Sequence, residues 1–410
     1  MKRRRQQRIC QRGALDRLRQ ATVLLLTVFV LTAGGCGKKA DFPAPAEETA
    51  QTEIAPTEQA GSAPSTEISP SSPAATDPTT PENAPIPTEA QEQTTAPRTT
   101  LTTNGGSVSL SSLAHRTEDE SAPVVWFTKN ITAEALLDLY TVLTPGLPGK
   151  VAVKLTTGES QATNFLKPAL IGDLVKKVDG TIIECMTAYG GVRSSAALSK
   201  QAAKDRGYTA IAPFDLLDED GDKDIPYNGD GRIDRAIVGS HIDNYDSVLV
   251  LSHFKGHPMA GFGGAIKNVG IGMSSRKGKI YVHSAGTRTA GTIIHADQNG
   301  WLEALAEAVK AVSDYENDGK NMLYISVMNR LSVDCDCMAL PAQPDMHDVG
   351  MLASADPVAL DQACVDLVYA APDGGSLIAR MEALNGVHVL EHAEAIGLGS
   401  RTYRLVTIDE

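Results

Sequence analysis

From Ser121 onward, short apolar runs alternate with amphipathic segments, a pattern that predicts strands alternating with helices. The predicted strands are 124–127, 151–155, 181–185, 248–251 and 323–328, with another short one beginning at Ala210. Helical periodicity predicts helices over 165–178, 194–206 and 301–315. Two more helices are predicted to begin where Thr132 and Asp356 can act as N-caps. We therefore expect an α/β domain with a mostly parallel sheet and helices on both faces.

The first 120 residues lack this pattern and divide into two segments. Residues 1–35 join a basic start to a short apolar run, which is typical of an export signal. That run ends in Leu31-Thr-Ala-Gly-Gly-Cys36, which resembles a bacterial lipobox, so Cys36 is the predicted lipidation site. An uncleaved N-terminal anchor is the alternative. Residues 36–120, rich in Pro, Thr and Glu, are predicted to be a disordered linker.

These boundaries leave residues 121–410 as the α/β domain and predict an extracytoplasmic protein held at the cell membrane by a lipid. The net charge of the chain is −13, and residues 1–35 carry eight basic side chains and one acidic, so the mature protein would carry −20. Nucleic acid is excluded as a partner, because binding it requires a basic face. The remaining basic residues cluster between 253 and 279, which favours a small anionic ligand.

That basic cluster belongs to a segment, 252–283, in which histidines and lysines lie among many glycines. It follows the strand 248–251, and ligands of open α/β sheets bind beyond the carboxyl ends of strands. A glycine-rich turn with solvated lysines is the alternative. The predicted catalytic residues are His253, Lys255, His257 and Lys267. The predicted residues for an anion or cofactor are Gly261, Gly263, Gly264, Lys267 and Asn268.

A second candidate site, Ser332-Val-Asp-Cys-Asp-Cys337, also follows a strand. In an extended segment Cys335 and Cys337 point the same way, so they could bind a soft metal or join an iron–sulfur site. Two buried, inert thiols are the alternative. Cys185 ends another strand and could converge with them. Further ligands are available nearby at Asp334, Asp336, Asp345, His347 and Asp348.

The acidic segment Asp218–Asp234 suggests calcium, because hard cations prefer carboxylate oxygens. The glycine spacing of an EF-hand is absent, so an acidic surface loop is the favoured interpretation. Cys364 shares a helical face with leucines and valines and is predicted to lie in the core. His388 and His392 are predicted to be structural or solvated.

The chain from Val151 onward resembles a prokaryotic family of unknown function, number 362 in the domain-of-unknown-function series. Members are often fused to ferredoxin-type iron–sulfur modules, whereas this chain has no Cys-x-x-Cys-x-x-Cys run. The stretches that carry the resemblance are 252–268, 327–329 with 332–337, 344–348 and 354–364.

A shorter stretch, His257-x-x-x-Gly-Phe-Gly-Gly-x-x-Lys267, resembles the nickel-pincer lactate racemase family. That resemblance implies that Lys267 could anchor a nickel-containing nucleotide, that His257 is an acid–base residue and that His283 is a metal ligand. The candidate cofactors are therefore nickel, zinc or an iron–sulfur cluster. Our leading hypothesis is a metal-dependent redox or isomerase-type site for a small anion, with a redox protein as a possible partner. The rival is a non-catalytic lipoprotein that binds an anion or a metal.

Overall fold

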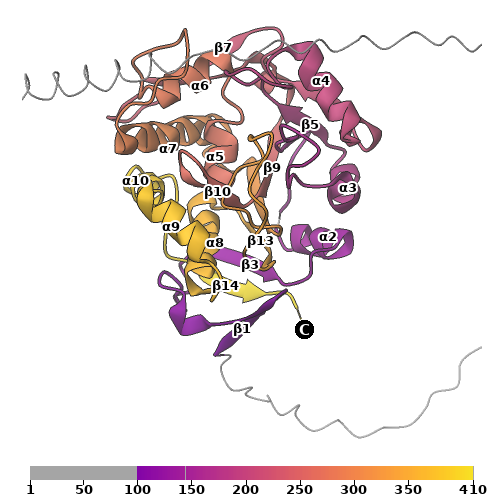
Figure 1. Ribbon diagram of the computed structural model, residues 1–410, viewed down its shortest axis with the longest axis vertical. Helices are drawn as coiled ribbons and strands as arrows, with labels where there is room; N and C mark the ends of the chain where they lie inside the picture. Colours follow the sequence, from indigo (N-terminus) through magenta and orange to yellow (C-terminus); the bar gives the residue numbers. More distant parts are fainter. Residues whose placement is uncertain (1–98, 144, 410) are drawn as a thin grey trace, which may run out of the picture. The chain divides into compact units, whose positions relative to one another are not determined.

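The computed structural model describes residues 99–143 and 145–409 of the chain (Figure 1). The predicted export signal, Cys36 and the first part of the predicted linker lie outside the described residues. The end of that linker contains a hairpin of β1 (Thr100–Thr103) and β2 (Gly106–Ser109), whose Leu101 and Val108 pack in the core. Within the described residues, no helix is long and apolar enough to span a membrane.

An eight-stranded sheet forms the centre of the domain, with the strand order β14-β3-β13-β12-β9-β4-β5-β6. Only β13 runs against its two neighbours, and the other neighbouring pairs are parallel. The mostly parallel α/β sheet expected from the sequence is therefore confirmed. Its strands are β3 (Val124–Thr128), β4 (Val151–Lys154), β5 (Thr181–Glu184), β6 (Phe214–Leu216), β9 (Ser247–His253), β12 (Met322–Met328), β13 (Gly350–Ser354) and β14 (Arg404–Thr407).

The sequence pattern located most of these strands but not all of them. The strand predicted to begin at Ala210 starts at Phe214, because residues 208–210 form a 3-10 helix (η2, Tyr208–Ala210). β13 and β14 were not expected. β14 is only half-buried at the edge of the sheet, so it carries no continuous apolar run.

Helices cover both faces of the sheet (Figure 1). Alternate residues of each buried strand point to opposite sides, so both faces are apolar and each needs a layer of helices to cover it. One face is covered by α2 (Ala133–Thr141), α3 (Pro168–Lys177) and α4 (Ala196–Asp205). The other face is covered by α5 (Ala265–Gly270), α6 (Arg276–His283), α7 (Gln298–Tyr315), α8 (Pro357–Ala370), α9 (Gly375–Ala383) and α10 (His388–Ala395). Thr132 and Asp356 cap α2 and α8 through their side chains, as predicted.

Two further hairpins lie outside the main sheet. β7 (Asp222–Pro226) pairs with β8 (Arg235–Gly239), and the acidic segment spans the turn between them. β10 (Lys255–His257) pairs with β11 (Gly261–Gly263), directly after β9. Two short 3-10 helices complete the described secondary structure, η1 (Leu110–Ser112) and η3 (Ser240–Asn244).

Candidate functional site

Four adjacent parallel strands end at one cavity. The strands β12, β9, β4 and β5 are neighbours, so their carboxyl ends meet at one edge of the sheet. The cavity there measures about 130 Å³. Lys154 and Glu184 are the last residues of β4 and β5, and both line it. The loop after β12, the hairpin after β9 and the helices α5 and α6 also line it, so the two segments singled out in the sequence face the same space.

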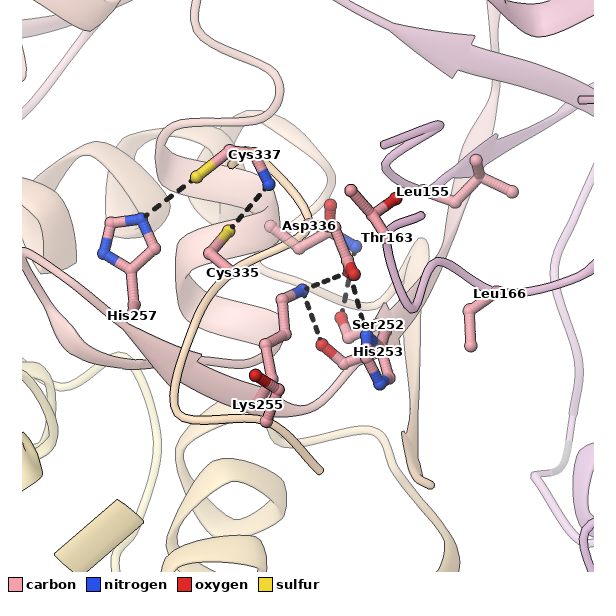
Figure 2. Close-up of polar contacts among 12 residues, drawn as sticks. Leu155, Thr163, Leu166, Ser252, His253, Lys255, His257, Cys335, Asp336 and Cys337 are labelled. Carbon is pink, nitrogen blue, oxygen red and sulfur yellow. Dashed lines mark hydrogen bonds and ion pairs between the residues drawn. The ribbon is translucent and has the colours of Figure 1, made fainter. Parts of the chain in front are cut away.

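Three side chains converge on the wall of this cavity. The ligand atoms of His257, Cys335 and Cys337 all lie within 4.8 Å of one another. His257 Nε2 is 3.8 Å from Cys337 Sγ, and the Cys337 amide donates to Cys335 Sγ over 3.3 Å. Figure 2 shows His257 and Cys337 pointing toward each other, while Asp336 between the two cysteines turns the other way. These three residues, the His–Cys–Cys group, form a candidate metal-binding site.

The imidazole of His257 is neutral and has a defined tautomer. Burial, reinforced by the positive charge of Lys267, lowers the pKa of His257 to about 4. Its Nδ1 accepts hydrogen bonds from the amides of Met259 (3.2 Å) and Ala260 (3.0 Å). Because a neutral imidazole has one donor and one acceptor nitrogen, the proton lies on Nε2, facing Cys337.

The two cysteines differ in the direction of their pKa shifts. A hydrogen bond from the Cys337 side chain, with the positive charge of Lys267, holds the pKa of Cys335 well below its usual range although burial opposes it. The same bond and burial raise the pKa of Cys337. Cys335 is therefore the cysteine that ionises more readily, and thiolate is the form that binds metals or attacks electrophiles.

His253 and Lys255 are both engaged with Asp336. His253 Nδ1 lies 2.8 Å from Asp336 Oδ2, and its Nε2 lies 2.7 Å from the carbonyl oxygen of Asn329. Lys255 donates to the carbonyl oxygen of His253 and lies 3.3 Å from the same carboxylate. Burial works against the positive charge of Lys255, but Asp336 and Cys335 raise its pKa. The structure therefore uses both residues, predicted as catalytic, to hold the cysteine loop in place.

A buried ion network supports the same loop, and the sequence analysis did not identify it. Arg193 donates from Nη1 to Glu184 (2.7 Å) and from Nε to Glu159 (3.1 Å), and all three side chains are buried. The amide of Glu159 in turn donates to the carbonyl oxygen of Asp336 over 2.8 Å. The network thus links the end of β5 to the Cys335–Cys337 loop.

Lys154 is a second feature that the sequence analysis missed. Burial lowers its pKa to about 7, although the carboxylate of Glu184 opposes the shift. Its ammonium donates to the carbonyl oxygen of Leu155 (2.7 Å) and to Asn268 Oδ1 (2.9 Å). The amide group of Asn268 also donates to Leu251 and Ser252, so Asn268, predicted to bind an anion or cofactor, ties strand ends together. Lys154 and Glu184 could have been found in the sequence, because each is a charged residue at the end of an apolar run. No such sequence signal marks Arg193.

The glycines have structural roles that differ among themselves. Gly263 and Gly264 line the cavity, as expected of an open ligand site. Gly261 has a φ of +82°, and a Cβ there would lie 2.8 Å from Gly386, so it serves backbone packing and not the cavity. The two amides that follow Gly264, those of Ala265 and Ile266, donate to the carboxylate of Asp361 in α8, so they are not available to an outside anion.

The other sequence candidates lie away from the His–Cys–Cys group. Cys185 lines the cavity but donates to the carbonyl oxygen of Met273, and burial raises its pKa to about 12. His347 pairs with Asp373 instead of a metal. Cys364 is buried in the core as predicted. His388 and His392 of α10 pair with Glu303 and Glu307 of α7, which agrees with a structural role.

An open, mostly parallel α/β sheet with a basic cavity at its carboxyl edge is the class of fold that the structure defines. The model of a domain family of unknown function, DUF362, matches residues 151–366, and the chain belongs to this family. No curated protein shows significant similarity to the chain.

Two solved structures show distant similarity. One is the lactate racemase apoprotein from Thermoanaerobacterium thermosaccharolyticum, with 15% sequence identity and a TM-score of 0.30, over 56% of this chain and 55% of that chain. The other is a protein from Thermotoga maritima, with 9% identity and a TM-score of 0.35, over 66% of this chain and 60% of that chain. The chain thus matches little more than half the length of the lactate racemase apoprotein.

Proposed function

We propose that the cavity is a metal-dependent site for redox or isomerase-type chemistry on a small anion, in an exported protein that a lipid at Cys36 holds at the membrane. The observation that carries the proposal is the His–Cys–Cys group in the wall of a basic cavity. The cavity is lined by five basic and two acidic side chains, so an anion is the favoured occupant.

The donor set favours a borderline or soft metal. Two sulfur atoms and one imidazole nitrogen suit zinc or nickel. Three protein ligands leave a fourth position for water or substrate, as in catalytic zinc sites. An ordinary iron–sulfur cluster needs about four cysteines. Among residues 99–143 and 145–409, only Cys335 and Cys337 belong to the group, so zinc and nickel fit better than a cluster.

The tautomer of His257 sets a condition on metal binding. A metal at Nε2 takes the place of the proton there, so the neutral ring would carry its proton on Nδ1. That proton would then face the amides of Met259 and Ala260, which now donate to Nδ1. We therefore expect the 257–260 turn to move when a metal binds, and hydrogen exchange at these two amides should speed up.

Within such a site the roles of the residues follow from their surroundings. The metal would act as a Lewis acid on an oxygen of the substrate. Lys267 would hold the anionic group, because its ammonium lines the cavity without a described partner. The network of Arg193 and Asp336 would fix the loop that carries both cysteines.

Metal analysis of anaerobically purified protein tests the proposal. We expect close to one zinc or nickel ion per chain, and loss of that ion in a Cys335→Ser/Cys337→Ser double variant. A Cys185→Ser variant is the matched control, since this buried thiol lies outside the group, and it should retain the metal. Well-folded protein without nickel, zinc or iron would refute the metal half of the proposal.

A non-catalytic binding lipoprotein is the second candidate. The observation that favours it is that His253 and Lys255 both form internal hydrogen bonds. The cavity is therefore left with few free acid–base groups for catalysis. Lys267→Ala separates the candidates. Loss of anion binding in this variant, together with no detectable turnover by the parent protein, would favour the binding module.

A further inference from the structure

Two side chains of the cavity stand out because no described residue satisfies them. Lys267 extends from α5, and neither a hydrogen bond nor an ion pair joins its ammonium to the described part of the chain. His283 ends α6 and is 5% exposed. Its ring forms no hydrogen bond to a described residue, and Nδ1 is fully enclosed.

The other lysines of the cavity are different. Lys154 donates to Leu155 and Asn268, Lys255 to His253, and Lys279 to the carbonyl oxygen of Ser274 over 2.5 Å. A buried polar group without a partner costs about 1–3 kcal/mol. That cost applies to His283, which is buried, whereas Lys267 is half-buried. A buried histidine and a lysine without described partners in one cavity therefore point to a ligand that supplies the acceptors.

We propose that Lys267 and His283 form an oxyanion-binding site, in which the ammonium of Lys267 and the Nε2–H of His283 donate to two oxygens of a carboxylate or phosphate group, since the enclosed Nδ1 is out of reach of a ligand. This inference deepens the proposed function and rests on its anion, but it does not depend on the metal. The bound group would lie at one end of the ligand, and the rest would reach toward the His–Cys–Cys group.

The surroundings of His283 support a donor role. Burial, then the positive charges of Lys267 and Lys279, hold the pKa of His283 well below its usual range. A neutral imidazole keeps one N–H to donate. The resemblance to the racemase family implied a metal ligand at this position. His283 does not belong to the His–Cys–Cys group, whose ligand atoms lie within 4.8 Å of one another, and its role as a metal ligand stays a prediction.

The structure also supplies a reporter for this site. The ring of His283 stacks on Trp301, with centroids 4.7 Å apart and an angle of 29° between the rings. The chain has only two tryptophans, and the other is Trp126 on β3. In a Trp126→Phe protein, tryptophan emission therefore comes from Trp301 alone and reports on the environment of His283.

The experiment titrates Trp126→Phe protein with sodium phosphate and with sodium acetate, at an ionic strength held constant with chloride. Emission of Trp301 locates the binding, and calorimetry measures the affinity. We expect saturation with at least one of the two anions. Saturation with phosphate alone would identify a phosphoryl ligand, and saturation with acetate would identify a carboxylate; either supports the site.

Variants test the two donors. Lys267→Met and His283→Phe should each weaken binding by about tenfold or more, since a hydrogen bond to a charged group contributes about 1.5–3 kcal/mol. Phenylalanine retains the stack on Trp301 but removes both nitrogens. His295→Phe is the matched control: its exposed ring packs edge-on against both His283 and Trp301, phenylalanine keeps these contacts, and the affinity should stay within about twofold.

Failure of both anions to saturate, or an equal loss of affinity in His295→Phe and His283→Phe, would overturn the inference. Repeating the titration in the Cys335→Ser/Cys337→Ser background separates it from the metal proposal. Binding that survives there supports the oxyanion site whether or not the parent holds a metal. A parent that binds zinc but neither anion would leave the metal proposal standing and refute this one.

Discussion

Two regions of this chain resemble metal sites in the sequence, and the structure treats them in opposite ways. In the acidic segment, Asp218 accepts two backbone amides, Asp220 pairs with His241, and Asp234 accepts from the hydroxyl of Tyr281. In the His–Cys–Cys group, the ligand atoms face one another at the wall of a cavity. Both regions thus contain residue types that can bind a metal, carboxylates in one and an imidazole with two thiols in the other, but only in the His–Cys–Cys group do the ligand atoms converge on one point.

The difference follows from where each segment lies. The acidic segment spans the β7–β8 hairpin, where β8 places Arg235 beside Asp224 and α6 places Lys277 beside Asp222. The cysteine loop lies beyond the end of β12, beside three other strand ends. Hairpin carboxylates are therefore neutralised locally, while the ligand atoms of His257, Cys335 and Cys337 face one another at the strand ends.

The largest expected effect concerns the ion network behind the cysteine loop. Arg193→Met leaves Glu184 and Glu159 buried without their partner, so the free energy of unfolding should fall by about 3–5 kcal/mol. Urea denaturation measures it. Arg235→Met removes the exposed pairs of the hairpin and should cost no more than about 1 kcal/mol. Similar losses in both variants would contradict the contrast between the two regions.

The next effect concerns support of the metal ligands. Asp336 holds the loop between the two cysteines through His253 and Lys255, so Asp336→Asn should weaken zinc binding by about 10–100-fold in the folded protein. Competition with a chromophoric chelator measures the affinity, and far-UV circular dichroism confirms folding. Asp220→Asn, in the acidic segment, should leave zinc affinity unchanged. A zinc affinity that is unaffected by Asp336→Asn would mean that the loop needs no such anchor.

The pH dependence of stability provides a third test. The folded pKa of Lys154 is about 7, against 10.5 for the free side chain, so between these values the unfolded chain binds more protons. The contribution of Lys154 to the free energy of unfolding is therefore fully present above pH 10.5, decreases as the pH falls, and is lost once the pH has fallen through 7. Between pH 7 and 9, the free energy of unfolding should rise by about 2 kcal/mol less in Lys154→Met than in the parent.

Lys223 in the β7–β8 hairpin is the control for this test. Hydrogen bonds to Asp243 and Tyr315 raise the pKa of Lys223, so it stays charged in both states below pH 9. Lys223→Met should therefore leave the change between pH 7 and 9 as it is in the parent. Identical pH profiles for the parent and Lys154→Met would show that Lys154 is not neutralised in the fold.

The smallest expected effect is that of calcium. Because the carboxylates of the acidic segment are already paired, millimolar calcium chloride should shift the melting temperature by less than about 1 °C, as should its removal by a chelator. Differential scanning calorimetry checks this. A stabilisation of several degrees would show that the acidic segment binds calcium despite its internal pairs.

The sequence predicted the parts of the fold that depend on local patterns. The buried strands β3, β4, β5, β9 and β12 each appear as apolar runs, and Thr132 and Asp356 supply recognisable helix caps. The sequence also singled out His257, Lys267, His283 and both cysteines, in two candidate segments, but it left open whether they share one site. It could not assign their contacts, because His253 and Asp336, for example, are 83 residues apart in the chain.

The sequence by itself determined the fold class and the segments that line the cavity, because apolar periodicity and residue type are properties of a local stretch of chain. Only the tertiary structure decided which polar groups bind one another within the domain and which have no partner among the described residues. His253, Lys255 and Asn268 are bound internally, whereas Lys267 and His283 have no described partner. That division depends on four strand ends meeting at one edge of the sheet, and strand order is set by packing over the whole domain.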